Sequence, residues 1–460
     1  MKFRKFGKTL LACALSSAMV FSLSSCVRSF TVGYLYATGT VTATPSGDGI
    51  ITGFGINNNN GKLKLLHGFP TSSGGANPVR AVLVDGSTFV YVLNRGTTAS
   101  GGANCTTTDP CQNSNITEFS VGGNGSLSYQ NTFYTQGINP FRLIADTSGN
   151  YLIALDHDAP SSTYCSTVVI GATSCGDITI FQINQTTGRL TLVTNAQLTA
   201  SSGTQVTYFP VPANPIDFVM ASGYVMTLSG AASASTTPSA SNAGQTVYPY
   251  AYNSSSGQLT LSQSIPQVIT NGNGEPIGQG TAILYTGAKI YVLDNEILVG
   301  TSTTPGQILP FTVGTNGALQ ALVGGAVADD PNETSPIFGI TESKGKYFYV
   351  ANQAGSDINT AAGITAYVID PSSSQLSEAS GSPYTLITST TSDTGTGASP
   401  QCLLEDPSNQ FIYTANAGDS TVTGKLLDPN SGALNQVQGW TGQMTLNGPA
   451  TWCWISGRTN

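Results

Sequence analysis

One sequence unit recurs along almost the whole chain and constrains its fold more than any other feature. Its clearest copy spans Ser335 to Leu376, where three short runs rich in β-branched and aromatic residues are separated by Gly, Pro, Ser or Asp. Such runs predict strands joined by turns, and we expect a fourth strand after the Leu. The second run begins at seven places that lie 55 to 73 residues apart, namely Tyr34, Phe89, Tyr151, Tyr224, Lys289, Tyr347 and Phe411.

A tight turn marks the start of the fourth strand in every unit. The turns are Gly61-Lys-Leu63, Gly125-Ser-Leu127, Gly188-Arg-Leu190, Gly257-Gln-Leu259, Gly317-Ala-Leu319, Ser374-Gln-Leu376 and Gly432-Ala-Leu434. The Gly supplies a positive φ for a hairpin, and the Leu returns an apolar side chain to the sheet. Seven copies of a four-stranded antiparallel unit predict an all-β fold, a seven-bladed β-propeller.

A proline opens the first strand of each unit, where its missing N–H costs no ladder hydrogen bond. These positions are Asn77-Pro78, Asn139-Pro140, Asn214-Pro215, Glu275-Pro276, Ser335-Pro336, Ser399-Pro400 and Gly448-Pro449. The last unit has no second strand and the first unit has no first strand. We therefore expect Pro449 to Ile455 to form the innermost strand of the blade made by residues 34–67, which closes the ring without an open sheet edge.

Residues 1–25 have the pattern of an export signal: four basic residues precede an apolar stretch from Leu10 to Leu23 that is short for a membrane span. The stretch ends in Leu23-Ser24-Ser25-Cys26, which resembles the lipobox of bacterial lipoproteins, whose Cys is acylated. The resemblance implies a lipid anchor at Cys26, a linker over residues 26–33 and a propeller over 34–460. Val27 after the Cys favours the outer membrane or cell surface. The alternative is an ordinary signal peptide with a chance Cys.

The cysteines also favour export. Cys105 and Cys111 fall in one predicted loop, and Cys165 and Cys175 fall in another, at spacings that suit local disulfides. The remaining pair lies on two neighbouring inner strands, where equal side-chain parity predicts a bridge that secures the ring closure; its members are Cys402 and Cys453. A metal site is the competing interpretation, but the chain has no Cys-x-x-Cys and only two His. We therefore expect no metal and no cofactor.

Charge excludes one class of partner. Charged residues make up 9% of the chain, against about 25% in ordinary domains. Without residues 1–25 the chain keeps 12 Lys and Arg against 24 Asp and Glu, which gives a formal net charge of −12. Nucleic-acid binding is not expected, because no basic stripe exists to neutralise phosphates. The repeat runs through the whole length, so we expect one domain and a monomer.

Candidate site residues come from the order of the strands. The prolines and the long loops Thr97 to Asn113 and Ala159 to Cys175 should share one face, which we expect to be the binding face. The position two residues after each proline should surround the upper channel: Arg80, Arg142, Asp217, Gly278, Phe338, Cys402 and Thr451. The ends of the second strands should fall near them: Asn94, Arg95, Asp156, His157, Asp158, Asp294, Glu296, Asn352 and Asn416.

Two interpretations of these residues stay open. Arg80 and Arg142 could hold a carboxylate or phosphate while His157 with Asp156 or Glu296 serves as acid and base. Alternatively, the two arginines pair with Asp217 and neighbouring acids, and His157 is a solvated residue at a strand end. No nucleophile elbow, phosphate loop or dinucleotide fingerprint occurs in a suitable context.

Several motifs resemble those of the lactonase-type seven-bladed propellers, which include 6-phosphogluconolactonase relatives and Tyr-Val-Thr-Asn repeat proteins. The motifs include Tyr349-Val-Ala-Asn352 and Tyr413-Thr-Ala-Asn416, and the resemblance covers residues 30 to 460. It implies the propeller fold. Active members typically carry a His-Pro-His segment, and Asn139-Pro140-Phe141-Arg142 stands at the corresponding place without either His. The departure implies that the hydrolytic chemistry is lost or replaced.

Three functions are compatible with these features. The first is an envelope lipoprotein whose binding face holds a small anionic or carbohydrate ligand or a protein partner. The second is a lactone hydrolase in which Arg80 and Arg142 clamp the ligand and His157, Asp156 or Glu296 activates water. The third is an envelope scaffold with no pocket.

Overall fold

The computed structural model of the 460-residue chain describes residues 29–40, 47–84, 88–102, 105–106, 108–230, 244–261, 266–272, 274–295, 298–299, 302–303, 306–330, 335–353, 363–385, 397–437, 440 and 442–457. Within this part of the chain, no helix has the length and apolar character that crossing a membrane requires.

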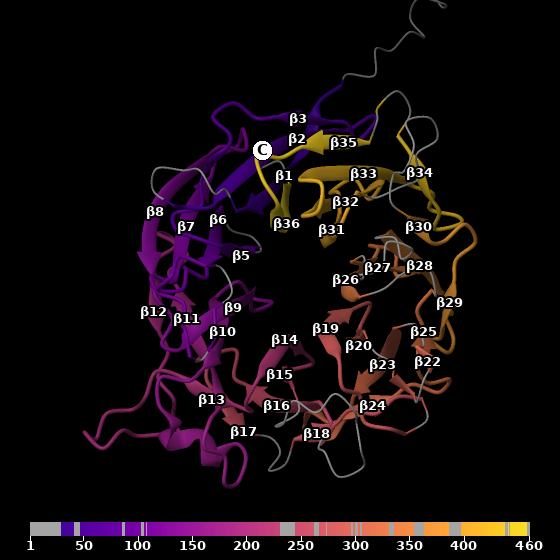
Figure 1. The fold of residues 1–460 in the computed structure, drawn as a ribbon. Helices are drawn as coiled ribbons and strands as arrows, with labels where there is room; N and C mark the ends of the chain where they lie inside the picture. Colours follow the sequence, from indigo (N-terminus) through magenta and orange to yellow (C-terminus); the bar gives the residue numbers. More distant parts are fainter. Residues whose placement is uncertain are drawn as a thin grey trace, which may run out of the picture.

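Seven β-sheets stand as blades around a central channel, and Figure 1 shows them as a ring. Each blade has four antiparallel strands. They lie side by side, with the first strand next to the channel and the fourth at the rim. Blade 1 contains β36 (Ala450–Gly457), β1 (Thr31–Gly39), β2 (Ile50–Asn57) and β3 (Leu63–Leu65). Blade 2 contains β5 (Pro78–Leu83), β6 (Phe89–Asn94), β7 (Asn115–Val121) and β8 (Leu127–Phe133). Blade 3 contains β9 (Ile138–Ala145), β10 (Tyr151–Asp158), β11 (Gly176–Ile183) and β12 (Leu190–Leu192).

The remaining blades repeat this order. Blade 4 contains β14 (Pro215–Ala221), β15 (Tyr224–Ser229), β16 (Thr246–Tyr252) and β17 (Leu259–Leu261). Blade 5 contains β19 (Gly280–Thr286), β20 (Lys289–Asp294), β23 (Gln307–Val313) and β24 (Leu319–Ala321). Blade 6 contains β26 (Pro336–Thr341), β27 (Tyr347–Asn352), β28 (Gly363–Ile369) and β29 (Leu376–Glu378). Blade 7 contains β31 (Pro400–Glu405), β32 (Phe411–Asn416), β33 (Thr421–Leu427) and β34 (Leu434–Gln436).

Short additional elements decorate the blades. In every described blade except blade 2, a fifth segment pairs with the third strand: β4 (Thr71–Ser72), β13 (Phe209–Val211), β18 (Gln267–Val268), β25 (Val327–Ala328), β30 (Tyr384–Thr385) and β35 (Gln443–Thr445). The others are the hairpin β21 (Leu298–Val299) and β22 (Ser302–Thr303) and the 3₁₀ turns η1 (Ser162–Thr167) and η2 (Thr315–Gly317). The sequence repeat did not predict these elements.

The predicted fold and ring closure are confirmed. The C-terminal strand β36 pairs antiparallel with β1, with Tyr36 opposite Trp454, so the two ends of the chain complete one blade. Six of the seven second strands begin at the predicted residue, and β1 begins three residues earlier than predicted, at Thr31. Closure in this way removes the free inner edge that an open sheet would expose.

Three proline-based strand starts were wrong. Strand β36 begins at Ala450, so Pro449 lies just before it. Strand β19 begins at Gly280, because Pro276 forms an isolated bridge with Thr270 at the end of the preceding loop. Strand β9 begins at Ile138, so Pro140 is its third residue.

The core lies between the blades. Second strands such as β27 are buried along their whole length, because both faces of a blade pack against its neighbours. Tyrosines on these strands donate hydrogen bonds to carbonyls in the Gly-x-Leu turn of the next blade. For example, Tyr349 Oη lies 2.8 Å from the carbonyl oxygen of Gly432, and Tyr413 Oη lies 2.7 Å from that of Gly61. The two sequence markers of the repeat are therefore the two halves of one contact between blades.

Strand direction gives the disc two distinct faces. The top face carries the starts of the inner strands and the loops Thr97 to Asn113 and Ala159 to Cys175. The bottom face carries the Gly-x-Leu turns. All three predicted disulfides form, two in these top loops and one, Cys402–Cys453, between inner strands β31 and β36.

Candidate functional site

A β-bulge near the start of the inner strands determines which side chains reach the upper channel. In β5 the bulge lies between Pro78 and Arg80, so Arg80 pairs with Leu93. The corresponding residues of all seven blades are Trp452, Arg80, Arg142, Asp217, Ala282, Phe338 and Cys402. The sequence offset from proline gave five of these positions. Ala282 replaces Gly278 because β19 starts late. Trp452 takes this position in β36 because the bulge lies one residue further along, and the predicted Thr451 also lines the upper mouth.

Arg80 is held by stacking. Its Cζ atom lies 3.5 Å from the ring centroid of Trp452, within range of a cation–π interaction. Trp452 is fixed in turn, since its Nε1 donates to the carbonyl oxygen of Ala81 at 3.2 Å and its ring meets Phe338 edge-on at 5.1 Å between centroids. Among the described residues, the Arg80 guanidinium has neither an ion-pair partner nor a hydrogen bond.

Electrostatics make this position unusual. Burial and, secondarily, the Arg142 guanidinium hold the pKa of Arg80 well below its usual value, while Asp217 acts in the opposite direction. A guanidinium nevertheless stays charged at physiological pH. The lowered pKa therefore expresses an unfavourable environment for the charge, which a bound anion would relieve.

Arg142 is already engaged in an ion pair. Its Nε lies 2.9 Å from Asp217 Oδ1, and its Nη1 donates to the carbonyl oxygen of Phe141 at 3.2 Å. Asp217 Oδ2 also accepts a hydrogen bond of 3.1 Å from the backbone N–H of Ile283. Asp217 therefore links blades 3, 4 and 5. Of the two arginines proposed as anion ligands from the sequence, one has an internal partner and one does not.

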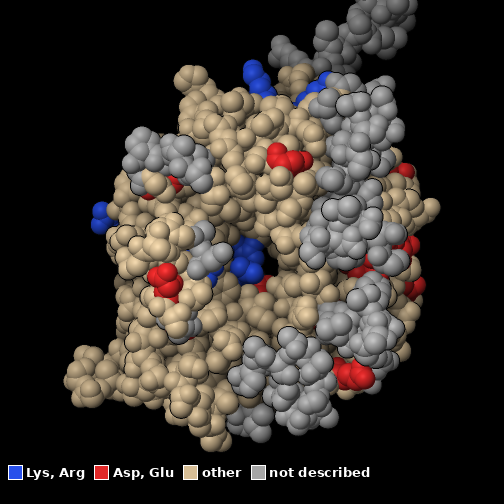
Figure 2. Space-filling model, in the orientation of Figure 1, with Lys and Arg blue, Asp and Glu red and all other residues tan. Residues whose placement is uncertain are grey.

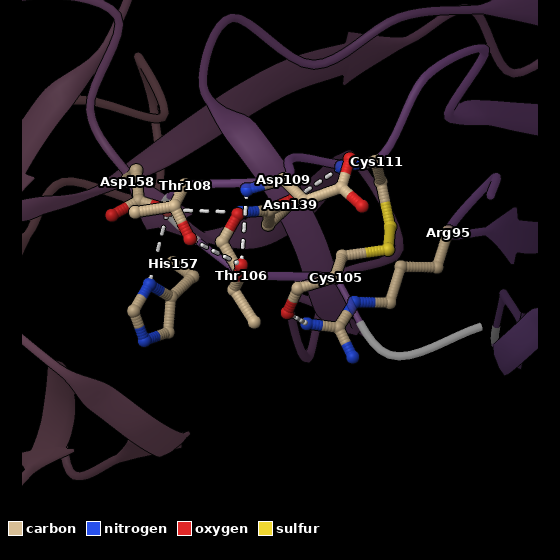
Figure 3. A network of polar contacts seen from close by, with 9 residues as sticks. All are labelled: Arg95, Cys105, Thr106, Thr108, Asp109, Cys111, Asn139, His157 and Asp158. Carbon is tan, nitrogen blue, oxygen red and sulfur yellow. Dashed lines mark hydrogen bonds and ion pairs between the residues drawn. A yellow bond between two sulfur atoms is a disulfide. The ribbon is translucent and has the colours of Figure 1, made fainter. Parts of the chain in front are cut away.

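A third arginine lies close by at the end of β6. Burial and then the Arg142 guanidinium lower the pKa of Arg95, and Asp158 opposes this effect. Arg95 Nη2 donates to the carbonyl oxygen of Cys105 at 3.5 Å, which ties Arg95 to the disulfide loop (Figure 3). Arg80, Arg95 and Arg142 thus form a cationic cluster in an acidic chain.

Figure 3 also shows how the top loop of blade 2 docks on blade 3. The backbone N–H of Cys111 donates to Asn139 Oδ1 at 2.7 Å, and Asn139 Nδ2 donates to Asp158 Oδ2 at 2.9 Å. The same Asp158 oxygen lies 3.1 Å from Nδ1 of His157, whose side chain is one-third exposed. His157 is therefore an oriented imidazole at the top of blade 3, and Phe141 contacts both its ring and the Arg142 guanidinium.

Other predicted site residues are buried inside blades. Asn94 is opposite Pro78 whereas Arg80 is opposite Leu93, so Asn94 and Arg80 lie on different faces of blade 2. Asn94 donates to Thr117 Oγ1 at 3.0 Å. The same arrangement recurs at Asp156, Asp294, Asn352 and Asn416, which bond to Thr179, Gln307, Thr365 and Thr423. Glu296 lies outside the described residues.

Asp156 has a partner that the sequence did not reveal. It is opposite Asp177 across β10 and β11, and both residues are fully buried. Burial raises the pKa of Asp156 to about 7, opposed by hydrogen bonds from Thr135 and Thr179. Burial and the Asp156 carboxylate raise the pKa of Asp177 well above its usual value. Such a pair favours sharing a proton over carrying two charges.

Two cavities meet at Arg80, Arg142 and Trp452. The upper mouth has a volume of about 320 Å³ and a polar wall that includes Gln353, Gln401 and Thr281. The channel cavity has a volume of about 390 Å³. Arg80, Arg142 and Trp452 line both. Figure 2 shows Lys or Arg atoms in the central opening of the disc. Among the described residues, no group of three or more His, Cys, Asp or Glu is placed to hold a metal ion.

The sequence placed Phe338 at the upper channel but could not identify Trp452, Gln353 or Gln401 as residues of the same site. They come from three blades, and only the register of each inner strand places them together.

Comparisons with known proteins agree with the fold. Residues 47–208 match the family model described as Lactonase, 7-bladed beta-propeller. No curated protein matches the sequence. A candidate 6-phosphogluconolactonase of Bacteroides uniformis is 14% identical with a TM-score of 0.58, and the match covers 93% of this chain and 100% of that one. A candidate 6-phosphogluconolactonase of Bacteroides fragilis is 15% identical with a TM-score of 0.57, covering 92% and 98%. A periplasmic gluconolactonase of Pseudomonas aeruginosa is 14% identical with a TM-score of 0.56, covering 93% and 100%. At these identities the likeness shows a shared fold.

Proposed function

We propose that this lactonase-type seven-bladed β-propeller is an exported, lipid-anchored protein that binds a small anionic ligand in the upper mouth of its channel. The observation that carries the proposal is the Arg80 guanidinium, which is stacked on Trp452 and has no anionic partner among the described residues. Arg95 and Arg142 add positive charge next to it, in a chain with twice as many acids as bases once residues 1–25 are removed.

The wall of the mouth fits a carboxylate or phosphate. A guanidinium presents paired N–H donors that match the two oxygens of such groups. Amide and hydroxyl groups of Gln353, Gln401 and Thr281 lie around the same cavity and suit further polar atoms of a ligand. Trp452 keeps the guanidinium in place before the ligand arrives, which reduces the entropy lost on binding.

The test is anion binding by an Arg80 variant. Isothermal titration of the purified protein with gluconate, glucuronate and phosphate should show binding of at least one of them. Arg80→Met should weaken that binding at least tenfold, because a charge-assisted hydrogen bond contributes about 1.5–3 kcal/mol. Arg189→Met removes the same charge from an exposed turn and should leave the affinity unchanged. Equal affinity in Arg80→Met and the native protein would contradict the proposal.

Export and anchoring form a separate part of the proposal. They are supported by the Leu23-Ser24-Ser25-Cys26 motif and by three disulfides, which persist in oxidising compartments. Metabolic labelling with palmitate should mark the native protein but not Cys26→Ala, which should leave the membrane fraction. If the label persists in Cys26→Ala, the proposed lipid anchor at Cys26 is wrong. That result would not bear on the proposed ligand site. We also propose a monomer, which light scattering of the purified protein tests.

Lactone hydrolysis is a second candidate, favoured by the family match over residues 47–208 and by the oriented imidazole of His157. The supporting carboxylate would be Asp158, because Asp156 lies buried within blade 3. The imidazole Nε2 would then activate water while Arg80 stabilises the developing oxyanion. Hydrolysis of gluconolactone above the spontaneous rate, lost in His157→Gln with ligand binding retained, would support this candidate. A rate equal to the spontaneous one would exclude it for that substrate.

A further inference from the structure

The channel is divided by a layer of side chains that we call the waist, formed by Arg80, Arg142 and Trp452. Above the waist lies the polar mouth, and below it the wall of the 390 Å³ cavity changes character. Blades 2, 3, 4 and 6 contribute half-buried apolar side chains there, namely Val82, Ile144, Val219 and Ile340. We call this apolar part of the cavity the lower chamber.

The alternation of the inner strands explains this division. Residues two apart along a strand face the same side, so Val82 lies one step below Arg80 and Ile144 one step below Arg142. Leu284 of blade 5 stands at the same step, so five blades present an aliphatic residue there, whereas the first step carries the two arginines and Asp217. The chamber is thus apolar along its wall and positively charged at one end.

The positive charge of Arg80 at that end of the chamber can bind an anionic ligand. Arg142 is paired with Asp217, but the Arg80 guanidinium has no anionic partner among the described residues. Trp452 cannot swing aside without losing the hydrogen bond to Ala81 and the edge-on contact with Phe338. A ligand that enters the chamber therefore meets a fixed cation next to an aromatic face.

We propose that the lower chamber binds the apolar tail of an alkyl carboxylate whose carboxylate group lies on Arg80. This inference rests on the proposed function and assigns a ligand class to the same arginine. A heavily hydroxylated tail is disfavoured, because the aliphatic side chains of the wall offer no hydrogen-bond partners for its hydroxyl groups. The volume accommodates roughly a dozen groups of the size of a water molecule, which sets the upper limit of tail length near that of octanoate.

The experiment is a chain-length series measured by isothermal titration of the purified protein with acetate, butanoate, hexanoate and octanoate. Burial of each additional methylene should tighten binding by about fourfold until the chamber is full. Val219→Thr makes the wall polar at nearly constant volume, and Ile144→Trp fills the space. Both variants should bind acetate as the native protein does and should lose the dependence on chain length. Ile170→Ser, at an exposed loop position, is the matched control and should keep it.

The outcomes separate this inference from the proposed function. If acetate and octanoate bind equally well and both depend on Arg80, the tail site is wrong and the anion site stands. If phosphate binds in an Arg80-dependent way but no carboxylate does, the tail site is wrong and the anion site stands. If neither phosphate nor any carboxylate binds, or if Arg80→Met changes nothing, both are wrong. If octanoate binds better but Val219→Thr and Ile144→Trp leave its advantage intact, the tail lies elsewhere and the inference is overturned.

Discussion

At the scale of single residues, the repeat provides its own internal controls. The last register pair between the second and third strands is Asn94–Asn115 in blade 2 and Asp294–Gln307 in blade 5. Both pairs are joined by an amide hydrogen bond. Blade 3 has Asp156–Asp177 at this place, where one carboxyl must keep a proton to act as a donor. Asp177 Oδ1 has no hydrogen-bond partner among the described residues.

Because of this carboxyl pair, we predict that the free energy of unfolding falls as the pH rises. Both folded pKa values lie above the usual aspartate value, with Asp156 at about 7, so the folded state binds more protons than the unfolded state above pH about 4. The free energy of unfolding should therefore decrease from pH 5 through pH 8. Asp177→Asn restores an amide donor, as in blade 5, and should raise the unfolding free energy at pH 8 by about 1–3 kcal/mol.

Thermal unfolding of native protein, Asp177→Asn and Asp419→Asn at pH 5 and pH 8 checks this prediction. Asp419 is exposed, and its replacement keeps an acceptor for Thr421, so that variant should follow the native pH profile. A native melting temperature that rises between pH 5 and pH 8, with the same rise in Asp177→Asn, would show that the pair is ionised without penalty.

At the scale of elements, the sequence predicted the strands well because their markers are local. Six of the seven second strands begin with an aromatic or long side chain after a turn, and the Gly-x-Leu turns are short-range signals. The prediction that a proline opens each first strand was wrong at Pro276, because Pro276 forms a bridge with Thr270 in the preceding loop and the strand starts after it. The site residues were less predictable, because a bulge that shifts by one residue, as in β36, exchanges Thr451 for Trp452.

The contact between blades also varies with the turn residue. Tyr349 and Tyr413 donate to the carbonyls of Gly432 and Gly61. Tyr291 occupies the same strand position in blade 5, and the turn of the next blade has Ser374 in place of Gly. The buried hydroxyl of Tyr291 has no hydrogen-bond partner in the described structure. The repeat thus contains satisfied and unsatisfied copies of one interaction.

Removal of the hydroxyl should therefore have opposite effects in different blades. Tyr349→Phe and Tyr413→Phe each lose a buried hydrogen bond and leave a carbonyl unpaired, so they should lower the unfolding free energy by about 1–2 kcal/mol. Tyr291→Phe removes an unsatisfied polar group and keeps the ring that stacks on Phe348, so it should be neutral or stabilising. Denaturant unfolding of the three variants measures the difference. Equal losses in all three would mean that Tyr291 has a partner after all, such as bound water.

At the scale of the whole molecule, the ring closure was predictable and its geometry was not. The unpaired strand at each end of the repeat array required β36 to join β1. The Cys402–Cys453 bridge was predicted from equal side-chain parity, and it is confirmed for a different reason. Counted from the bulge, Cys402 is the first residue and Cys453 the second, so the two side chains lie on opposite faces of their own blades. Where two neighbouring blades pack, one face of the first blade contacts the opposite face of the second, so these two side chains point toward each other.

This disulfide connects the last blade to the blade that contains both ends of the chain, and it is buried in the core shared by blades 7 and 1. It closes a loop of 51 residues, so cross-linking restricts the unfolded chain more than the six-residue separation of Cys105 and Cys111 does. Cys402→Ala with Cys453→Ala should lower the unfolding free energy by about 2–4 kcal/mol. Cys105→Ala with Cys111→Ala should change it less and should instead weaken anion binding, because Arg95 bonds to the carbonyl of Cys105. Melting temperatures and titrations of the two double variants decide the matter: a larger loss of stability from the loop disulfide would mean that β36 holds the ring closed by its strand pairing alone.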